Sequence, residues 1–217
     1  MEVPKTTGIV LRYSPVTETS LIVTWLTRDF GKVRTMAKGA RRPQSPFRGQ
    51  VEPFYLDELL FVRSRRSDLH FLRECSLIEP HRHLREELPK LHAALYFCEL
   101  ADLGTQPEHG EPELFALLRS TLATLNDAAL HPLLVPHFEV NFLATLGFDP
   151  AARKTPMRPD LLKLFQQFRE LRPSELSRLK VSLAQSAALE DFFLAQAGQQ
   201  FGRLPRSRRF VVRSGMG

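Results

Sequence analysis

Two absences narrow the classes of protein that this sequence can encode. The chain of 217 residues has two cysteines, Cys75 and Cys98, which lie far apart, so neither a disulfide framework nor a CxxC metal or redox site is expected. We expect both thiols to be reduced and buried. No segment approaches the ~18 to 20 apolar residues of a membrane span. Residues 1–7 are polar and lack the apolar core of a signal peptide, so we expect a cytoplasmic protein without a membrane partner.

The motifs of common enzyme classes are also absent. GxxxxGK(S/T), GxGxxG and GxSxG do not occur, which removes the usual phosphate-binding loops and the nucleophile elbow of hydrolases. His81 and His83 have a spacing that two metal ligands can share, but no third ligand is near in the sequence, and we interpret both as exposed histidines in a linker. Neighbouring acids such as Glu86 and Glu87 do not share a face of a helix or strand. The sequence therefore favours a binding protein over an enzyme and predicts no catalytic residue, metal or cofactor.

Positive charge exceeds negative charge, but the excess changes sign along the chain. Residues 1–80 hold 13 Lys and Arg against 9 Asp and Glu, residues 81–150 hold 4 against 10, and residues 151–217 hold 13 against 5. The two basic regions predict surfaces for nucleic acid, and the acidic middle predicts a surface for a different partner, such as a basic protein. This partition favours two domains in a chain long enough to bury a sizeable core.

The first 80 residues have the composition of β-strands. Five segments rich in β-branched, aromatic and aliphatic residues are separated by turn signals, at 7–13, 20–27, 32–37, 54–62 and 69–76. Five strands with a long loop after the third suggest a small closed barrel, and the OB-fold is the commonest such barrel that binds nucleic acid. An SH3-like barrel is the alternative, because the number of strands alone does not separate the two.

After residue 80 the apolar residues change from a period of two to a period of about 3.6. Helices are predicted from Pro89, from Pro112, over 133–146, from Asp160 to Pro173, and over 174–200 with one break at 181–185. The predicted fold class is α+β, with a five-stranded OB-fold β-barrel domain at residues 1–80 followed by an all-helical domain at residues 81–217. The basic tail at 202–213 is either a disordered arm or a docked segment.

The segment 28–48 is strongly basic, with seven cations and one acid. In a strand over 32–37, the period of two places the two cations of the strand on one face and Val33 and Ala37 on the other. Glycines and prolines then mark a loop that carries four further cations. We predict that strand and loop together bind the phosphate groups of a nucleic acid. The predicted binding residues are Lys32, Arg34, Lys38, Arg41, Arg42 and Arg48.

The aromatic residues of the barrel region are expected to pack inside it, with one exception. Trp25 lies within a predicted strand and is expected in the core. Phe47 lies in the basic loop, and we expect it to be exposed, where a phenyl ring can stack on bases.

Several short motifs follow one another in a characteristic order. The most specific are TxxxGK at 27–32, AKGARR at 37–42 and SxFRG at 45–49. Others are GIVL at 8–11, ETSL at 18–21, PF at 53–54, LRE at 72–74, ELFALL at 113–118, LG at 146–147 and SRRF at 207–210. Together these motifs resemble the RecO family of bacterial recombination mediators, and the likeness spans nearly the whole chain.

The resemblance implies an OB-fold domain followed by a helical domain, with no need for a nucleotide. It implies binding of single- and double-stranded DNA, annealing of complementary strands, and loading of RecA together with RecR and the single-stranded-DNA-binding protein SSB, the RecA filament being an indirect partner. It assigns DNA binding to the cations of AKGARR and SxFRG, whereas Lys32 and Arg34 rest on strand geometry alone. A DNA repair and recombination protein of this kind is expected in the cytoplasm, associated with the nucleoid.

One feature of the family is missing from this sequence. Many members carry a four-cysteine zinc site shortly after the LG motif, whereas no cysteine follows Gly147 here. Zinc is therefore not expected, and we expect the zinc module to be lost. Arg153, Lys154 and Arg158 are candidates to supply charge in its place.

Two other functions stay open at this point. A structural RNA-binding OB-fold protein of the translation apparatus would prefer folded RNA to single-stranded DNA. A metal-dependent nuclease that uses His81 and His83 would need a divalent metal for cleavage, and the missing third ligand disfavours it.

Overall fold

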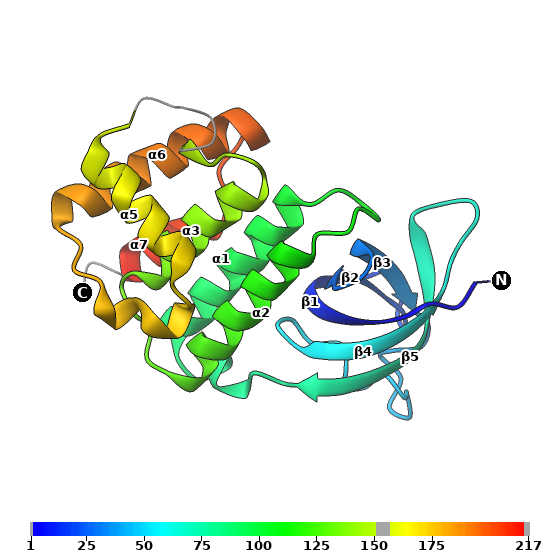
Figure 1. Ribbon diagram of the computed structural model, residues 1–217. Helices are drawn as coiled ribbons and strands as arrows, with labels where there is room; N and C mark the ends of the chain where they lie inside the picture. Colours follow the sequence, from blue (N-terminus) through cyan, green and yellow to red (C-terminus); the bar gives the residue numbers. More distant parts are fainter. Residues whose placement is uncertain (1, 151–156, 215–217) are drawn as a thin grey trace. The chain divides into compact units, whose positions relative to one another are not determined.

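The computed structural model describes residues 2–150 and 157–214, and the chain divides into two compact units. We call them the barrel unit, Met1–Arg82 with Thr105–Arg119, and the helical unit, His83–Gly104 with Ser120–Gly217. In chain order the strands come first and the helices follow (Figure 1). Because the segment Thr105–Arg119 belongs to the barrel unit, that unit is discontinuous in sequence.

The strands of the barrel unit close into one barrel in the order β1-β2-β3-β5-β4. Their bounds are β1 Lys5–Pro15, β2 Leu21–Thr27, β3 Gly31–Ala37, β4 Leu56–Val62 and β5 Leu69–Glu79. Neighbouring strands are antiparallel except β3 and β5, which run parallel, and β4 pairs with β1 to close the barrel. A five-stranded Greek-key barrel of this order is the OB-fold. The predicted fold is confirmed, and the SH3-like alternative is excluded.

Strand β3 shows the alternation that the sequence predicts. Its odd-numbered residues are buried, whereas the even-numbered Lys32 and Arg34 are half-buried on the outer face. Trp25 of β2 is fully buried, and its indole N–H donates a hydrogen bond to the hydroxyl of Thr35 at 2.8 Å. The prediction that Trp25 lies in the core is confirmed, and the Thr35 hydroxyl that faces inward has a partner.

Helices make up most of the rest of the chain. Their bounds are η1 Arg82–Arg85, α1 Leu88–Gly104, α2 Pro112–Asp127, α3 Leu134–Thr145, α5 Pro159–Glu170, η2 Pro173–Arg178, α6 Leu183–Phe201 and α7 Arg208–Ser214. A break is observed as predicted, but it lies at 179–182 and not at 181–185. Ser182 explains where the next helix begins. Its hydroxyl accepts a hydrogen bond from the backbone N–H of Gln185, whose side chain accepts one from the backbone N–H of Ser182. This reciprocal capping starts a new helix.

Phenylalanine rings from several helices form the core of the helical unit. The ring centroids of Phe97 in α1 and Phe138 in α3 lie 4.5 Å apart, and those of Phe142 in α3 and Phe201 in α6 lie 6.0 Å apart. The first three of these side chains have no exposed surface. Ring pairs at such distances add to the hydrophobic free energy of burial, so α1, α3 and α6 share one core.

The basic tail is docked on the helical unit. Glu99 of α1 accepts hydrogen bonds from the backbone N–H groups of Arg206 at 2.9 Å and Ser207 at 2.8 Å. Arg208 then lies 3.0 Å from the carboxylate of Glu190 and 3.7 Å from that of buried Glu139. Of the two alternatives for the tail, the docked segment is the one observed over residues 206–210.

Candidate nucleic-acid interface

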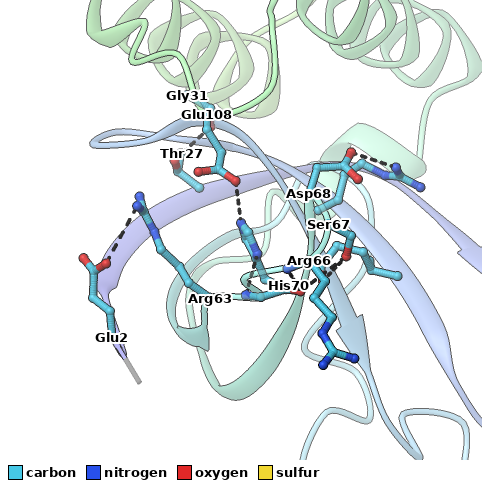
Figure 2. A network of polar contacts seen from close by, with 12 residues as sticks. Glu2, Thr27, Gly31, Arg63, Arg66, Ser67, Asp68, His70 and Glu108 are labelled. Carbon is cyan, nitrogen blue, oxygen red and sulfur yellow. Dashed lines mark hydrogen bonds and ion pairs between the residues drawn. The ribbon is translucent and has the colours of Figure 1, made fainter.

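Both basic residues of β3 contact other parts of the barrel unit, Arg34 through its side chain and Lys32 through its backbone. Nη1 of Arg34 lies 3.0 Å from Oδ2 of Asp68, a residue of the β4–β5 connection that is labelled in Figure 2. The backbone carbonyl of Lys32 accepts a hydrogen bond from the backbone N–H of Glu108 at 2.9 Å. A nucleic acid that contacts Arg34 must compete with Asp68, so part of the charge of this strand is already neutralised.

Glu108 belongs to a segment between α1 and α2 that packs on the barrel. Nε2 of buried His70 in β5 lies 3.0 Å from Oε1 of Glu108, while its Nδ1 accepts a hydrogen bond from the backbone N–H of Ser64 (Figure 2). Gly31 has φ of +61°, and a Cβ there would lie 1.7 Å from the carbonyl oxygen of His109. Only glycine permits this approach. Sequence reasoning missed the segment, and Gly31 was the one signal that could have indicated it.

The connection between β3 and β4, which we call the basic loop (residues 38–55), is an ordered structure. Successive turns are closed by backbone hydrogen bonds from Arg42 to Gly39, Ser45 to Arg42, Arg48 to Ser45 and Gln50 to Phe47. The two glycines of the loop have positive φ values of 68° and 71°. The backbone N–H of Arg41 donates to the carbonyl of Thr19 at 3.0 Å, and that of Leu77 donates to the side chain of Gln50 at 3.0 Å. The loop is thus fixed to the barrel at both ends.

Phe47 is buried, so the expectation that it is exposed and stacks on bases is wrong. Its exposed fraction is 6%, and it belongs to the same core cluster as Trp25 and Leu72. Burying such a ring stabilises a protein by about 1.5–3 kcal/mol relative to leaving it in water. The ring therefore turns inward while Pro46 and Arg48 on either side stay exposed. Phe47 anchors the basic loop to the core instead of binding a ligand.

The cations of the basic loop have no carboxylate partner within residues 2–150 and 157–214. Four of the predicted binding residues are exposed there: Lys38, Arg41, Arg42 and Arg48. Nη1 of Arg48 donates a hydrogen bond to the carbonyl of Pro43 at 3.2 Å, and Nζ of Lys38 lies 4.9 Å from the ring centroid of Phe71. Neither contact removes a positive charge. These side chains can meet phosphate without first breaking an ion pair.

Charge at the start of the basic segment is neutralised locally. Nε of Arg28 lies 3.1 Å from Oδ1 of Asp29, and the hydroxyl of Thr6 donates to Oδ2 at 2.6 Å. The guanidinium hydrogen bond, with that from Thr6, holds the pKa of Asp29 below its ordinary value. Within the segment 28–48, the positive charge that remains for a ligand therefore lies mainly on the basic loop.

Two exposed residues beside the basic loop were missed by the sequence reasoning. Phe71 and Arg73 lie on the outer face of β5, because the flanking His70 and Leu72 are buried and side chains alternate along a strand. The alternation in the sequence HFLR was the signal that could have found them.

The interpretation of His81 and His83 as two exposed linker histidines is wrong for His81. His81 is 4% exposed, with Nδ1 at 2.8 Å from the carbonyl oxygen of Phe54 and Nε2 at 3.4 Å from Glu79. Phe54 has a positive φ of 72°, so His81 satisfies a carbonyl at an unusual backbone position. His83 is exposed. Among the residues that the structure describes, no three His, Cys, Asp or Glu side chains gather into a possible metal site.

The two thiols are free, and their burial differs. Cys98 is buried in α1, as predicted, whereas Cys75 of β5 is half-buried against the barrel core. Burial raises the pKa of both thiols, which makes them poor nucleophiles.

Beside Cys75 lies Asp57 of β4, which has no exposed surface, and burial raises the pKa of its carboxyl to about 8.

Of the three basic residues suggested to supply charge in place of a zinc module, the structure describes only Arg158. Arg153 and Lys154 lie outside the described residues. Arg158 donates two hydrogen bonds to Asp160, at 3.1 and 2.9 Å, so its charge is locally neutralised. No helix within the described part of the chain combines the length and apolar character that crossing a bilayer requires.

Comparisons with known proteins identify relatives of both halves of the chain. Residues 1–81 match the family model described as Recombination protein O N terminal, and residues 85–156 match Recombination protein O C terminal. The two matches meet close to the end of β5.

Curated proteins named DNA repair protein RecO are similar over most of the chain. The protein from Syntrophus aciditrophicus is 34% identical over 166 residues, which is 74% of this chain and 64% of that protein. The protein from Salinibacter ruber is 36% identical over 152 residues, 70% of this chain and 58% of that protein. The match to the protein from Desulforudis audaxviator, at 31% identity over 246 residues, covers 98% of this chain and 97% of that protein. The chain thus spans about three-fifths of the first two relatives and nearly all of the third.

Proposed function

Because the chain belongs to the RecO family of DNA repair proteins, we propose that it is a recombination mediator that binds single- and double-stranded DNA through the basic loop. One observation carries the proposal: four exposed cations, which have no carboxylate partner among the described residues, are held on an ordered loop of an OB-fold barrel. Lys32 and Arg34 extend this surface onto β3. Phosphate contacts hold DNA without reading its sequence, so we expect low sequence preference.

Binding alone can account for strand annealing in this proposal. Two complementary strands repel each other through their phosphates, and cations that neutralise both strands on one surface lower that repulsion. No bond is made or broken in the protein, so the proposal includes no catalytic residue, nucleotide or metal.

We assign different tasks to the two halves of the chain. Residues 1–80 are proposed as the DNA-binding domain, and residues 81–217 as the domain that meets protein partners. The partners proposed for this family member are RecR and SSB, with RecA loaded onto the DNA as an indirect result. The proposed location is the cytoplasm, at the nucleoid.

The salt dependence of DNA binding tests this function directly. Anisotropy of a labelled single-stranded oligonucleotide is measured over a range of salt concentrations for the wild type and for a Lys38/Arg41/Arg42→Ala variant. Each phosphate contact on a single strand contributes about 0.7 to the slope of log K against log salt concentration, so the triple variant should show a slope shallower by about 2. Because all three side chains are exposed, the variant should unfold at the wild-type temperature.

A matched control removes the same charge from the helical unit. Lys163/Lys180/Arg203→Ala replaces three exposed cations there, and we expect its slope to equal that of the wild type. If the control lowers the slope as much as the loop variant, binding depends on total charge and the assignment to the basic loop fails. Tighter binding of folded RNA than of single-stranded DNA would instead support a role in translation.

A further inference from the structure

A hollow of about 400 Å³ lies in the barrel unit, next to the basic loop. It is lined by side chains of β3, the basic loop, β4 and β5: Met36, Lys38, Pro46, Phe47, Val62, Phe71, Leu72 and Arg73. Its volume falls within the ~300–1,000 Å³ typical of sites for small organic groups. Apolar side chains form most of the lining, and its polar groups are the two cations Lys38 and Arg73.

Phe71 is the aromatic side chain that this hollow presents to solvent. In the strand register, Phe71 of β5 lies opposite Met36 of β3 on one side and Val62 of β4 on the other. Its exposed fraction is 39%, whereas neighbouring Leu72 is 6% exposed. The ring therefore rests among apolar neighbours and keeps part of its surface open.

Two cations, Lys38 and Arg73, lie near the ring of Phe71, and the described residues that line the hollow include no acid. Nζ of Lys38 lies 4.9 Å from the centroid of the Phe71 ring, and Arg73 is exposed two residues further along β5. A lysine over an exposed ring is worth about a factor of 2 to 5 in an equilibrium constant. A nucleobase stacked on an aromatic side chain is worth about a factor of 5 to 150. A base can therefore displace Lys38 from the ring, and the freed ammonium remains close enough to meet a phosphate.

We propose that Phe71 stacks against an unpaired nucleobase of single-stranded DNA, with Lys38 and Arg73 neutralising the phosphates on either side of that base. This inference rests on the proposed DNA-binding function and adds base stacking, which the exposed cations of the basic loop do not provide. Bases in a duplex are stacked on one another and do not offer a free face, whereas those of a single strand do. Phe71 would then favour single strands, while the loop cations bind both forms.

The test compares three DNA ligands of equal length and label: a thymidine oligonucleotide, an abasic strand with the same phosphates, and a duplex. Each is titrated by anisotropy at fixed salt into the wild type, Phe71→Leu and Phe71→Trp. We expect Phe71→Leu to weaken thymidine binding about 10-fold, and to leave abasic and duplex binding within about 2-fold of the wild type. The salt slope should not change, because no cation is lost.

The indole in Phe71→Trp provides a second readout. The wild type has one tryptophan, Trp25, which has no exposed surface, so a new exposed indole is easily distinguished from it. Stacking predicts that thymidine DNA quenches this fluorescence and abasic DNA does not, with affinity equal to or above that of the wild type.

The outcomes separate this proposal from the proposed function. Wild-type thymidine binding by Phe71→Leu, equal losses on all three ligands, or no quenching by thymidine DNA overturns stacking, while the dependence on the basic loop can still hold. If neither the wild type nor the loop variant shows salt-dependent binding to any DNA, both proposals fail.

Discussion

The basic loop and the basic tail are alike in sequence, since both are short segments rich in arginine, but they differ in what surrounds them. Arg208 in the tail is 12% exposed in its side chain and contacts Glu139 and Glu190, and Glu99 receives two backbone N–H groups of the same segment. The loop cations contact no carboxylate in the described chain. A run of arginines can therefore fix a fold or bind a ligand, and the neighbouring acids decide which.

The largest expected change in stability comes from removing the side chain of Arg208, which fixes the basic tail to the helical unit. Burial raises the pKa of Glu139 to about 7, so at pH 8 this carboxylate is charged, and it is stabilised by the hydroxyl of Tyr96 and by Arg208. We expect Arg208→Ala to lower the free energy of unfolding by about 2–4 kcal/mol at pH 8, because it leaves a buried charge without its cation. At pH 6 the carboxyl is mostly protonated, and the loss should be smaller. Urea denaturation at the two pH values measures both.

Arg209→Ala is the matched control for this variant. Arg209 is exposed, and its guanidinium lies over the ring of Phe210 rather than at a carboxylate, so we expect a change below about 0.5 kcal/mol. Equal losses in the two variants, or a loss for Arg208→Ala that does not depend on pH, would contradict the role given to the Glu139 contact.

Buried Asp57 differs from Glu139, because no cation contributes to its pKa. The pKa of Asp57 is raised by burial to about 8, whereas an unfolded chain releases that proton near pH 4. The folded state therefore binds more protons between these values, and the free energy of unfolding should fall as the pH rises from about 4 to about 8. Asp57→Asn removes this titration. It should make the protein more stable by about 1–3 kcal/mol at pH 8 and flatten the pH profile of unfolding.

The exposed Asp191→Asn is the control for Asp57→Asn, since it removes the same charge from the surface of α6. We expect no change in the pH profile from it. A steep profile that survives Asp57→Asn would mean that another group titrates in this window.

The smallest change in stability is expected from removing the contact between Glu108, which follows α1, and His70 of the barrel. Glu108→Ala removes the side-chain contact with His70 but keeps the backbone hydrogen bond to Lys32. We expect a loss of about 0.2–1 kcal/mol in urea denaturation, the range of an ion pair with one partly exposed member. Exposed Glu74→Ala on β5 is the comparison and should change stability less. If Glu74→Ala lowers the free energy of unfolding more than Glu108→Ala does, the contact between Glu108 and His70 does not stabilise the barrel as proposed.

Local sequence patterns predicted most strands and helices, because these form through interactions between residues that are close in the sequence. The period of two in β3 and the capping of α6 at Ser182 both depend on residues within a few positions of one another. The cations of the basic loop were also predicted, since glycines and prolines next to charges indicate an exposed turn. Their binding role stays a prediction.

Long-range contacts explain what the sequence did not reveal. The burial of Phe47 depends on space inside a barrel built by five separate strands, and the burial of His81 depends on the carbonyl of Phe54, 27 residues away. The pairing of Arg34 with Asp68 and of Arg208 with Glu190 joins cations to acids from other elements. Neither the period of a segment nor its composition carries this information.

The discontinuity of the barrel unit has a consequence for synthesis on the ribosome. The segment Thr105–Arg119 completes that unit, yet it is made after the whole of α1. At ~5–20 residues per second, the five strands leave the ribosome a few seconds before this segment does. During that interval the backbone carbonyl of Lys32 lacks its partner at Glu108, and His70 lacks its carboxylate. The nascent chain therefore carries its basic loop on a barrel that still lacks these two contacts.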